Sequence, residues 1–349
     1  MEFTFTLEEN KYETYCRTTE DESQTMAKSD QKKFHICTPL HESLPLSKVA
    51  GTTVYIKLDN VQPTGSYKIR GIGHFCQKAA EEGCKHFVCS SGGNAGLAAA
   101  FAAQKLQIPA TILVPSSTPV FIIQKLKEHG AFVEVVGKVW DDANEQALKL
   151  SENDGWVYVS PFDHPLLWEG HASVVKELWE SLQRKPGAII LSVGGGGLLC
   201  GVIEGLKEVG WFDVPIIAME TKGAESLNAA VKAGKLITLP DITSVAKTLG
   251  AKRVCEKALQ NAQEHNVLSE VISDHKAVQA VERFLDDERF LVEPACGASL
   301  AAIYSGIIQR LQKEGRLDQD LQSVVVIVCG GSSITMAQLK EYKMQLEES

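Results

Sequence analysis

The stretch that decides the fold is Asn60-Val61-Gln62-Pro63-Thr64-Gly65-Ser66-Tyr67-Lys68-Ile69-Arg70-Gly71. It follows a short apolar run at 54–58 that predicts a strand, and its proline and glycine predict a turn. Ser66 is a candidate helix cap, which places Lys68 in the first turn of a helix over 68–82. The helix dipole disfavours a cation there, so we expect a lowered pKa for Lys68 and a larger share of free amine, which attacks carbonyl groups. Taken alone, such a lysine is more often a solvated surface residue.

Length and composition restrict the class of protein. The 349 residues, 44% of them hydrophobic and 23% charged, predict a soluble globular protein with two domains. A formal net charge of −9 argues against nucleic acid or an anionic membrane as partner. No apolar run is long enough to span a bilayer. The nine cysteines include no C-x-x-C pair, and their odd number without a signal peptide predicts reduced thiols and a cytoplasmic location.

Predicted strands and helices alternate along the chain after residue 33. The strands are continuous apolar runs, at 54–58, 86–89, 110–114, 132–136, 188–193, 216–220 and 324–328. Helices are predicted at 68–82, 95–106, 124–129, 172–184, 198–209 and 298–313. This pattern predicts an α/β protein with two doubly wound domains, each an open, mostly parallel sheet with helices on both faces.

The domain boundaries follow from the two blocks of alternating elements. Residues 34–65 and 162–349 are expected to form a large, cofactor-binding domain, and 66–161 a small domain. Residues 1–33 are polar and acidic, and we expect a mobile tail there.

Ligands of open parallel sheets bind beyond the carboxyl ends of the strands, so the loops after strands are informative. In one of them Gly194, Gly195, Gly196 and Gly197 open a helix, where bare backbone N–H groups favour a phosphate. The alternative is a tight turn that needs close packing. The loop lacks the Gly-Lys-Ser/Thr end of a P-loop and the glycine spacing of a dinucleotide site.

Three further loops carry chemically suggestive residues. The loop 90–96, with sequence Ser-Ser-Gly-Gly-Asn-Ala-Gly, offers donors for a small carboxylate, or simply a helix cap at Asn94. The others are Cys329-Gly330-Gly331-Ser332 and the segment from Glu220 to Ala224. A phosphate cradle, an activated lysine, an amide donor and a carboxylate-binding loop together indicate pyridoxal phosphate, which acts through a lysine and an electron-withdrawing ring.

The chain from about 34 to 345 resembles the serine/threonine dehydratases of pyridoxal-phosphate fold type II. The motifs that carry the resemblance are Gly65-Ser66-Tyr67-Lys68-Ile69-Arg70-Gly71, Ser90-Ser91-Gly92-Gly93-Asn94, Gly194-Gly195-Gly196-Gly197-Leu198-Leu199, Glu293-Pro294-Ala295-Cys296-Gly297 and Val328-Cys329-Gly330-Gly331. The resemblance implies a cofactor in the cleft between the two domains.

The resemblance also implies roles for individual residues. Lys68 carries the cofactor, Asn94 bonds its ring hydroxyl and Cys329 faces its pyridine nitrogen. The remaining cofactor-binding residues are Tyr67, Gly194, Gly195, Gly196, Gly197 and Leu198. The substrate carboxylate is taken by Ser91, Gly92, Gly93, Asn94 and Ala95. The family also implies a monovalent cation, with K+ as the candidate, and its ligand positions match Glu220, Ala224 and Leu249.

The activity implied is β-elimination, which converts L-serine into pyruvate and ammonia, and L-threonine into 2-oxobutanoate and ammonia. The family implies small amino acids as partners, a homodimer, and a place in amino-acid catabolism and gluconeogenesis. Animal members have alanine where Gly92 stands and phenylalanine where Tyr67 stands; alanine at 92 is expected to order the loop and raise activity. Two alternatives stay open: a weakly active cofactor-binding paralogue, and another fold type II lyase or β-replacement enzyme.

Overall fold

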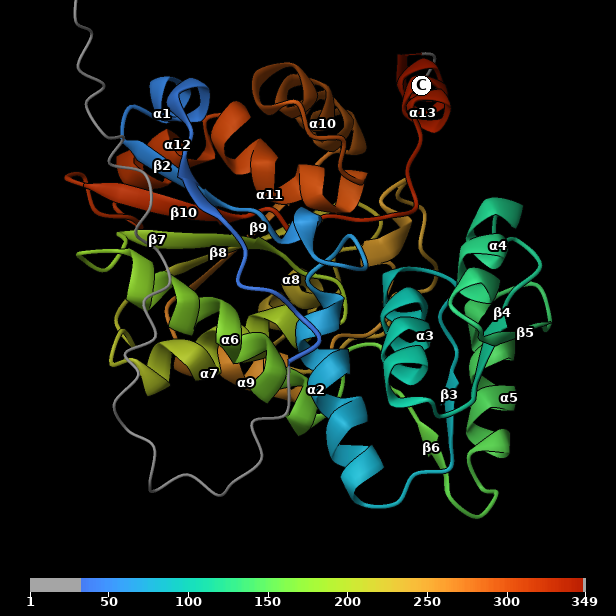
Figure 1. The fold of residues 1–349 in the computed structure, drawn as a ribbon. Helices are drawn as coiled ribbons and strands as arrows, with labels where there is room; N and C mark the ends of the chain where they lie inside the picture. Colours follow the sequence, from blue (N-terminus) through green and yellow to red (C-terminus); the bar gives the residue numbers. More distant parts are fainter. Residues whose placement is uncertain (1–32, 348–349) are drawn as a thin grey trace, which may run out of the picture. The chain divides into compact units, whose positions relative to one another are not determined.

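A computed structural model describes residues 33–347, and the predicted tail at 1–33 lies outside them apart from its last residue. The described strands form two sheets (Figure 1). Their bounds are β1 (Leu40–Glu42), β2 (Thr53–Lys57), β3 (His86–Cys89), β4 (Ala110–Val114), β5 (Phe132–Val135), β6 (Trp156–Tyr158), β7 (Ala188–Ser192), β8 (Ile216–Thr221), β9 (Val267–Ile272) and β10 (Ser323–Ile327).

The larger sheet has six strands in the order β1-β2-β10-β7-β8-β9, and only β1 runs antiparallel to its neighbour. Its inner strands β7 and β8 are buried along their whole length, as expected when helices cover both faces. Figure 1 shows one group of helices above the sheet and another below it. Above lie α1 (Leu44–Ala50), α10 (Asp274–Glu288), α11 (Pro294–Tyr304) and α12 (Ile307–Lys313); below lie α6 (Pro165–Ser181), α7 (Gly197–Glu208) and α9 (Glu256–Glu264).

The smaller sheet has four parallel strands in the order β5-β4-β3-β6. Alternate side chains of β3 enter two separate cores. Phe87 and Cys89 pack in the core shared with α2 (Lys68–Glu81), α3 (Asn94–Leu106) and α4 (Val120–Glu128), whereas Val88 packs against α5 (Trp140–Leu150). Both faces are thus covered, and the predicted α/β class with two mostly parallel sheets is confirmed.

Several predicted boundaries differ from the structure. The helix predicted over 298–313 is two helices, α11 and α12, because Gly306 takes a left-handed conformation with φ of 69° between them. The helix predicted over 172–184 begins earlier, at Pro165, where the ring of His164 caps the backbone N–H of Leu166. The elements that were not predicted are the strands β1, β6 and β9, the helices α1, α5, α8 (Ser226–Ala233), α9, α10 and α13 (Met336–Glu347), and the short 3-10 turns η1 (Asp59–Val61) and η2 (Lys247–Leu249).

The predicted division into a large and a small domain stays a prediction. The described residues form one compact unit, in which the four-stranded sheet uses residues 86–158. The six-stranded sheet uses 40–57 and 188–327.

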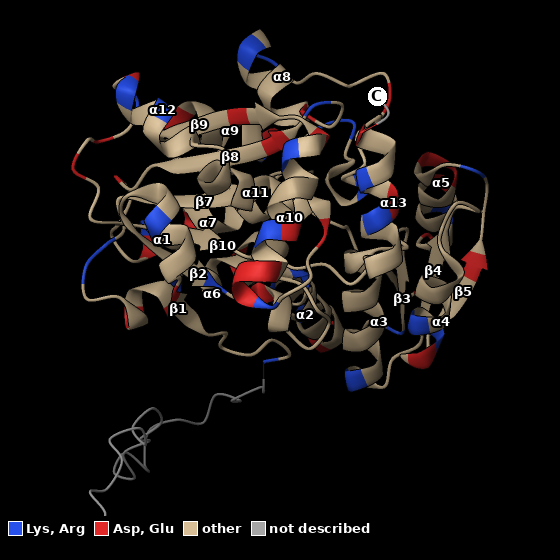
Figure 2. Cartoon of the chain, turned by 90° about the horizontal axis from the view of Figure 1, so that it is seen from above, with Lys and Arg blue, Asp and Glu red and all other residues tan. Residues whose placement is uncertain are grey.

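The outer surface mixes charges of both signs. In Figure 2, basic and acidic residues alternate along helices such as α10 and α13 rather than gathering by sign. No helix between residues 33 and 347 is long and apolar enough to cross a membrane. The eight cysteines in this part of the chain are free thiols.

Candidate functional site

The turn that carries Lys68 is joined to the loop after β10 by backbone pairing. Ser66 and Gly330 form an isolated antiparallel bridge, and the Tyr67 N–H donates to the Cys329 carbonyl over 3.1 Å. Gly330 has a φ of 90°, and a Cβ on it would lie 2.4 Å from the carbonyl oxygen of Gly65. Only glycine suits both the conformation and the close approach. The structure therefore brings the predicted lysine and cysteine loops together.

Lys68 is the first residue of α2, as predicted, but Ser66 does not cap the helix. The cap residue is Tyr67, and no side chain accepts a hydrogen bond there. The partly buried amine of Lys68 donates to the backbone oxygen of Pro161, and its Nζ lies 5.3 Å from the centre of the Tyr67 ring. Burial lowers the pKa of Lys68 to about 8, against a weaker opposite effect of the Cys89 and Cys329 thiols. The free amine is therefore much more populated near neutral pH than in an ordinary lysine.

The four-glycine loop joins β7 to α7, and its glycines leave no room for side chains. A Cβ on Gly195 would lie 2.2 Å from the ring of Phe162, and one on Gly196 would lie 2.4 Å from Cβ of Ala258. Gly196 also has a φ of 94°. Close packing therefore explains glycine at these positions. The backbone N–H groups of these glycines remain unbonded, because no atom within residues 33–347 accepts a hydrogen bond from the N–H groups of 194–197.

Asn94 begins α3, but it does not cap the helix, so that alternative is wrong. The cap residue is Gly93, and the Asn94 amide points elsewhere, donating to Glu293 over 3.1 Å and accepting from the N–H of Ser332 over 3.0 Å. The hydroxyl of Ser91 accepts from the Gly93 N–H over 3.2 Å. Ser91, Gly92 and Gly93 thus lead into α3, and Ala95 is the second residue of this helix.

Cys329 is buried beside Cys296. A hydrogen bond with the Cys296 thiol and burial hold the pKa of Cys329 well above its ordinary value. The thiol is therefore neutral at physiological pH.

The three predicted cation ligands lie near the end of β8 and in η2. Glu220 is fully buried, and its carboxylate accepts from the N–H groups of Leu227 and Asn228, each over 2.8 Å. No ion pair joins it to a basic side chain in the described chain, and burial raises its pKa to about 8. The backbone N–H of Ala224 donates a hydrogen bond to the carbonyl oxygen of Thr221, and Leu249 lies against Gly194.

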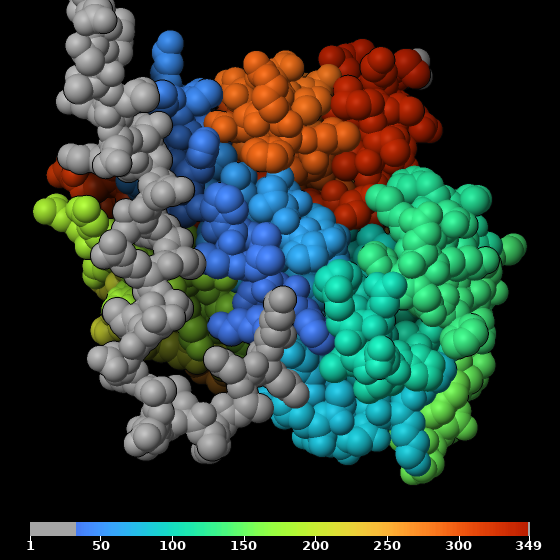
Figure 3. Space-filling view, in the orientation of Figure 1, coloured from blue at the N-terminus to red at the C-terminus, as the bar shows by residue number. Residues whose placement is uncertain are grey.

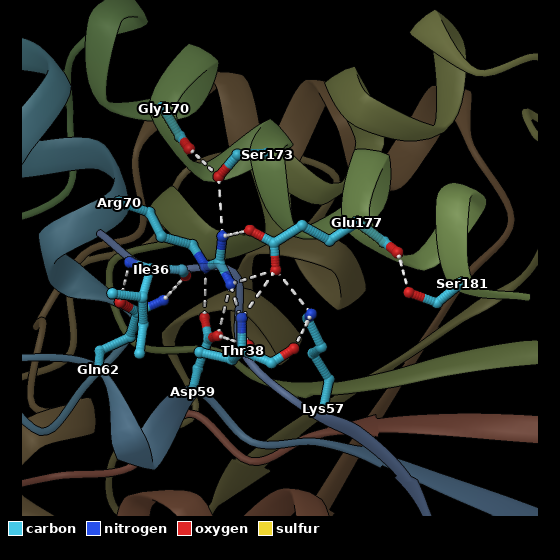
Figure 4. A network of polar contacts seen from close by, with 10 residues as sticks. All are labelled: Ile36, Thr38, Lys57, Asp59, Gln62, Arg70, Gly170, Ser173, Glu177 and Ser181. Carbon is cyan, nitrogen blue, oxygen red and sulfur yellow. Dashed lines mark hydrogen bonds and ion pairs between the residues drawn. The ribbon is translucent and has the colours of Figure 1, made fainter. Parts of the chain in front are cut away.

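A buried ionic network anchors the first turn of α2 (Figure 4). The Arg70 guanidinium contacts Asp59 over 2.7 Å and Glu177 over 2.6 Å. Lys57 contacts Glu177 over 2.6 Å, and Thr38 donates to Asp59 over 2.8 Å. The charge of Arg70 opposes the helix dipole in the first turn of α2, and the two carboxylates of this network compensate that charge.

Sequence reasoning missed three parts of this site. Phe162, which covers the glycine loop, carries no sequence signal. Arg70 and Glu293 both stood inside quoted motifs, yet their partners are distant in sequence. The roles assigned to the predicted site residues stay predictions.

Comparison with known proteins places this geometry in a family. Residues 32–330 match the model of the family described as "Pyridoxal-phosphate dependent enzyme". The human protein named L-serine dehydratase/L-threonine deaminase is 64% identical over 314 residues, which cover 90% of this chain and 96% of that protein. A rat serine dehydratase-like protein is 64% identical over 313 residues, 90% of this chain and 95% of that protein. The chain therefore belongs to the pyridoxal-phosphate dependent enzymes, together with the serine dehydratases and serine dehydratase-like proteins of mammals.

Solved structures agree with this assignment. A fungal L-serine ammonia-lyase from Rhizomucor miehei superposes with a TM-score of 0.84 at 39% identity, over 89% of this chain and 99% of the other. Threonine deaminase isoform 2 from Solanum lycopersicum superposes with a TM-score of 0.81 at 27% identity, over 90% of this chain and 85% of the other.

The residues present fit the family's cofactor. The amides of 194–197 are free to bind a phosphate, and a partly buried lysine with a lowered pKa is available for an aldehyde. The residues predicted to hold the cofactor are therefore chemically competent.

Replacing Gly195 by alanine is expected to weaken cofactor binding by about tenfold or more, because overpacking of this size costs about 1–3 kcal/mol. The added Cβ would displace the Phe162 ring and the loop beneath it. Fluorescence titration of the apo-protein with pyridoxal phosphate measures the effect. The double variant Gly195→Ala/Phe162→Leu should recover part of the loss, and unchanged affinity in the single variant would contradict this packing.

The rate of cofactor uptake should depend on the pKa of Lys68. Since the neutral amine attacks the aldehyde, the rate constant should rise about tenfold from pH 7 to 9 and then level off, as a pKa of about 8 requires. Stopped-flow absorbance of apo-protein mixed with pyridoxal phosphate reports this rate. A rate that keeps climbing beyond pH 10 would indicate an unperturbed lysine instead.

Proposed function

We propose that this chain is a pyridoxal-phosphate-dependent ammonia-lyase that converts L-serine into pyruvate and ammonia, and L-threonine into 2-oxobutanoate and ammonia. The observation that carries the proposal is the Lys68 amine, partly buried with a pKa lowered to about 8, in a chain whose loop 194–197 offers free backbone amides. The likeness to proteins named for serine and threonine deamination supports it.

When bound, pyridoxal phosphate supplies an aldehyde for the substrate's amino group and a ring that withdraws electrons from the substrate Cα. The amides of 194–197 and Leu198 hold the phosphate at the start of α7. The loop 91–95 holds the substrate carboxylate. The Lys68 amine would be the base that takes the Cα proton.

Two more residues complete the cofactor site. The Asn94 amide would hold the ring oxygen, and the Cys329 thiol, kept neutral by its raised pKa, would be the group offered to the ring nitrogen. Tyr67 supports the ring. A neutral thiol at this position would leave the ring nitrogen unprotonated, so the ring would withdraw electrons less strongly than with a carboxylate there.

We also propose a monovalent cation, K+ in the first instance, at Glu220, Ala224 and Leu249. A buried carboxyl without a basic partner in the described chain supports a cation there. The homodimer, the cytoplasmic location and the role in gluconeogenesis rest on the family resemblance and, for the location, on the cysteine pattern.

Assays on the purified, cofactor-loaded protein test the proposed function. Visible absorbance reports bound cofactor, and coupled assays report pyruvate and 2-oxobutanoate, with and without potassium. Bound cofactor without product from either amino acid would favour a cofactor-binding paralogue. L-serine consumed only in the presence of an added thiol, without formation of pyruvate, would favour a β-replacement enzyme.

The effect of alanine at position 92 depends on Thr118. A Cβ on Gly92 would lie 2.8 Å from Cγ2 and 2.9 Å from Oγ1 of Thr118. Gly92→Ala alone is therefore expected to give no gain in kcat/KM for L-serine, whereas Gly92→Ala/Thr118→Ala should gain up to about fivefold through loop ordering. The control is Thr118→Ala. A full gain in the single Gly92→Ala variant would contradict the clash.

A further inference from the structure

Glu293 is a buried carboxylate whose partners are all donors. It is 3% exposed at the start of α11, where the helix dipole favours negative charge. It accepts from the Thr248 hydroxyl over 2.6 Å, the Ser333 N–H over 2.7 Å and the Asn94 amide over 3.1 Å. Within residues 33–347, Glu293 forms no ion pair with a basic side chain.

These donors come from separate parts of the fold. Asn94 starts α3 beside the four-stranded sheet, Thr248 lies in η2, and Ser333 follows β10. Figure 3 shows the C-terminal part in red next to the green residues of the smaller sheet. Glu293 packs so closely that a Cβ on Gly331 would lie 2.1 Å from its Cδ. One carboxylate thus joins the loop expected to bind substrate to the loop after β10.

The Asn94 amide is held at both ends. Its oxygen accepts from the Ser332 N–H over 3.0 Å, and its nitrogen donates to Oε2 of Glu293 over 3.1 Å. Since a side-chain amide has one acceptor end and one donor end, these partners decide its orientation. One of the two amide hydrogens remains for another acceptor.

We propose that Glu293 is a positioning residue that orients the Asn94 amide so that it offers an N–H, rather than its carbonyl, to the ring oxygen of the cofactor. The proposal rests on the proposed function, in which Asn94 bonds that oxygen. In this proposal Glu293 acts through Asn94 rather than by contacting cofactor or substrate.

An isosteric amide at position 293 breaks this arrangement. In Glu293→Gln, an NH2 group in place of Oε1 would meet the Ser333 N–H, and one in place of Oε2 would meet the Asn94 NH2. Flipping the Asn94 amide would instead set its NH2 group against the Ser332 N–H. Every arrangement leaves buried donors facing each other, which is unfavourable.

A double-mutant cycle between Glu293→Gln and Asn94→Ala tests the proposal, with the apparent dissociation constant of pyridoxal phosphate as readout. Glu293→Gln should weaken cofactor binding by about tenfold in the wild-type background. In the Asn94→Ala background it should add no further loss, because the residue through which it acts is gone. The visible band of the bound cofactor should also shift in the single variant.

The controls separate orientation from stability. Glu270→Gln removes another buried acid, paired with Arg310 and Arg316, and should leave cofactor affinity within twofold. Should Glu293→Gln fail to fold, Glu293→Asp withdraws the same carboxylate and allows the same cycle. Equal losses in both backgrounds, or no loss in wild type, would overturn the proposal. A wild-type protein that binds no pyridoxal phosphate would instead overturn the proposed function.

Discussion

Lys68→Ala is expected to lower turnover of L-serine by about four orders of magnitude or more, since proton transfer by a positioned group alone contributes up to about that factor. The same change should remove the visible absorbance that a lysine-bound cofactor gives. The reason is that, in the proposed function, this amine both holds the cofactor and takes the proton. Coupled pyruvate assays and absorbance spectra of one protein batch measure both effects.

Lys78→Ala is the matched control. Lys78 lies on the same helix, exposed and paired with Glu81 over 2.9 Å, so its loss should change neither turnover nor spectrum. Turnover of Lys68→Ala within tenfold of wild type would refute the assignment.

Glu177→Gln is expected to lower the free energy of unfolding by about 3–5 kcal/mol, the usual cost of breaking a buried ion pair. The change leaves Lys57 and Arg70 facing Asp59 alone, so one buried positive charge is uncompensated (Figure 4). Urea denaturation followed by circular dichroism measures the loss. Because Arg70 lies in the first turn of α2, cofactor retention through Lys68 should fall as well.

Two variants control for this prediction. Lys176→Gln breaks a neighbouring pair with Glu208 that is half exposed, and should cost less than about 1 kcal/mol. Glu177→Gln/Lys57→Met removes the uncompensated charge and should recover part of the stability. If Glu177→Gln lowers the free energy of unfolding by less than about 1 kcal/mol, the network contributes little to the stability of the fold.

The buried strands, the glycine-rich loops and the start of α2 could be predicted from the sequence, because each depends on residues close together in the chain. Continuous apolar runs gave β3 and β4 with their observed bounds, because strands buried on both faces are recognisable without their neighbours. Glycine clusters after strands pointed to the loops at 91–95 and 194–197. The start of α2 at Lys68 was also predicted.

The side-chain contacts of the site could not be predicted from the sequence, because each joins residues that are far apart in the chain. Ser66 and Asn94 were both expected to be able to cap helices, yet Ser66 pairs with Gly330, and the Asn94 amide bonds Glu293 and Ser332. A capping preference is a small local energy that tertiary contacts override. The ring of Phe162 over Gly195 could not be predicted either, since the two residues belong to different elements.

Elimination from L-serine through Lys68 fixes the stoichiometry of the products. The ratio of pyruvate and ammonia formed to L-serine consumed can be measured on one sample of purified protein loaded with pyridoxal phosphate. We expect one pyruvate and one ammonia for each serine, at a rate that Lys68→Ala abolishes. Serine consumed without matching pyruvate, or bound cofactor with no consumption at all, would contradict it.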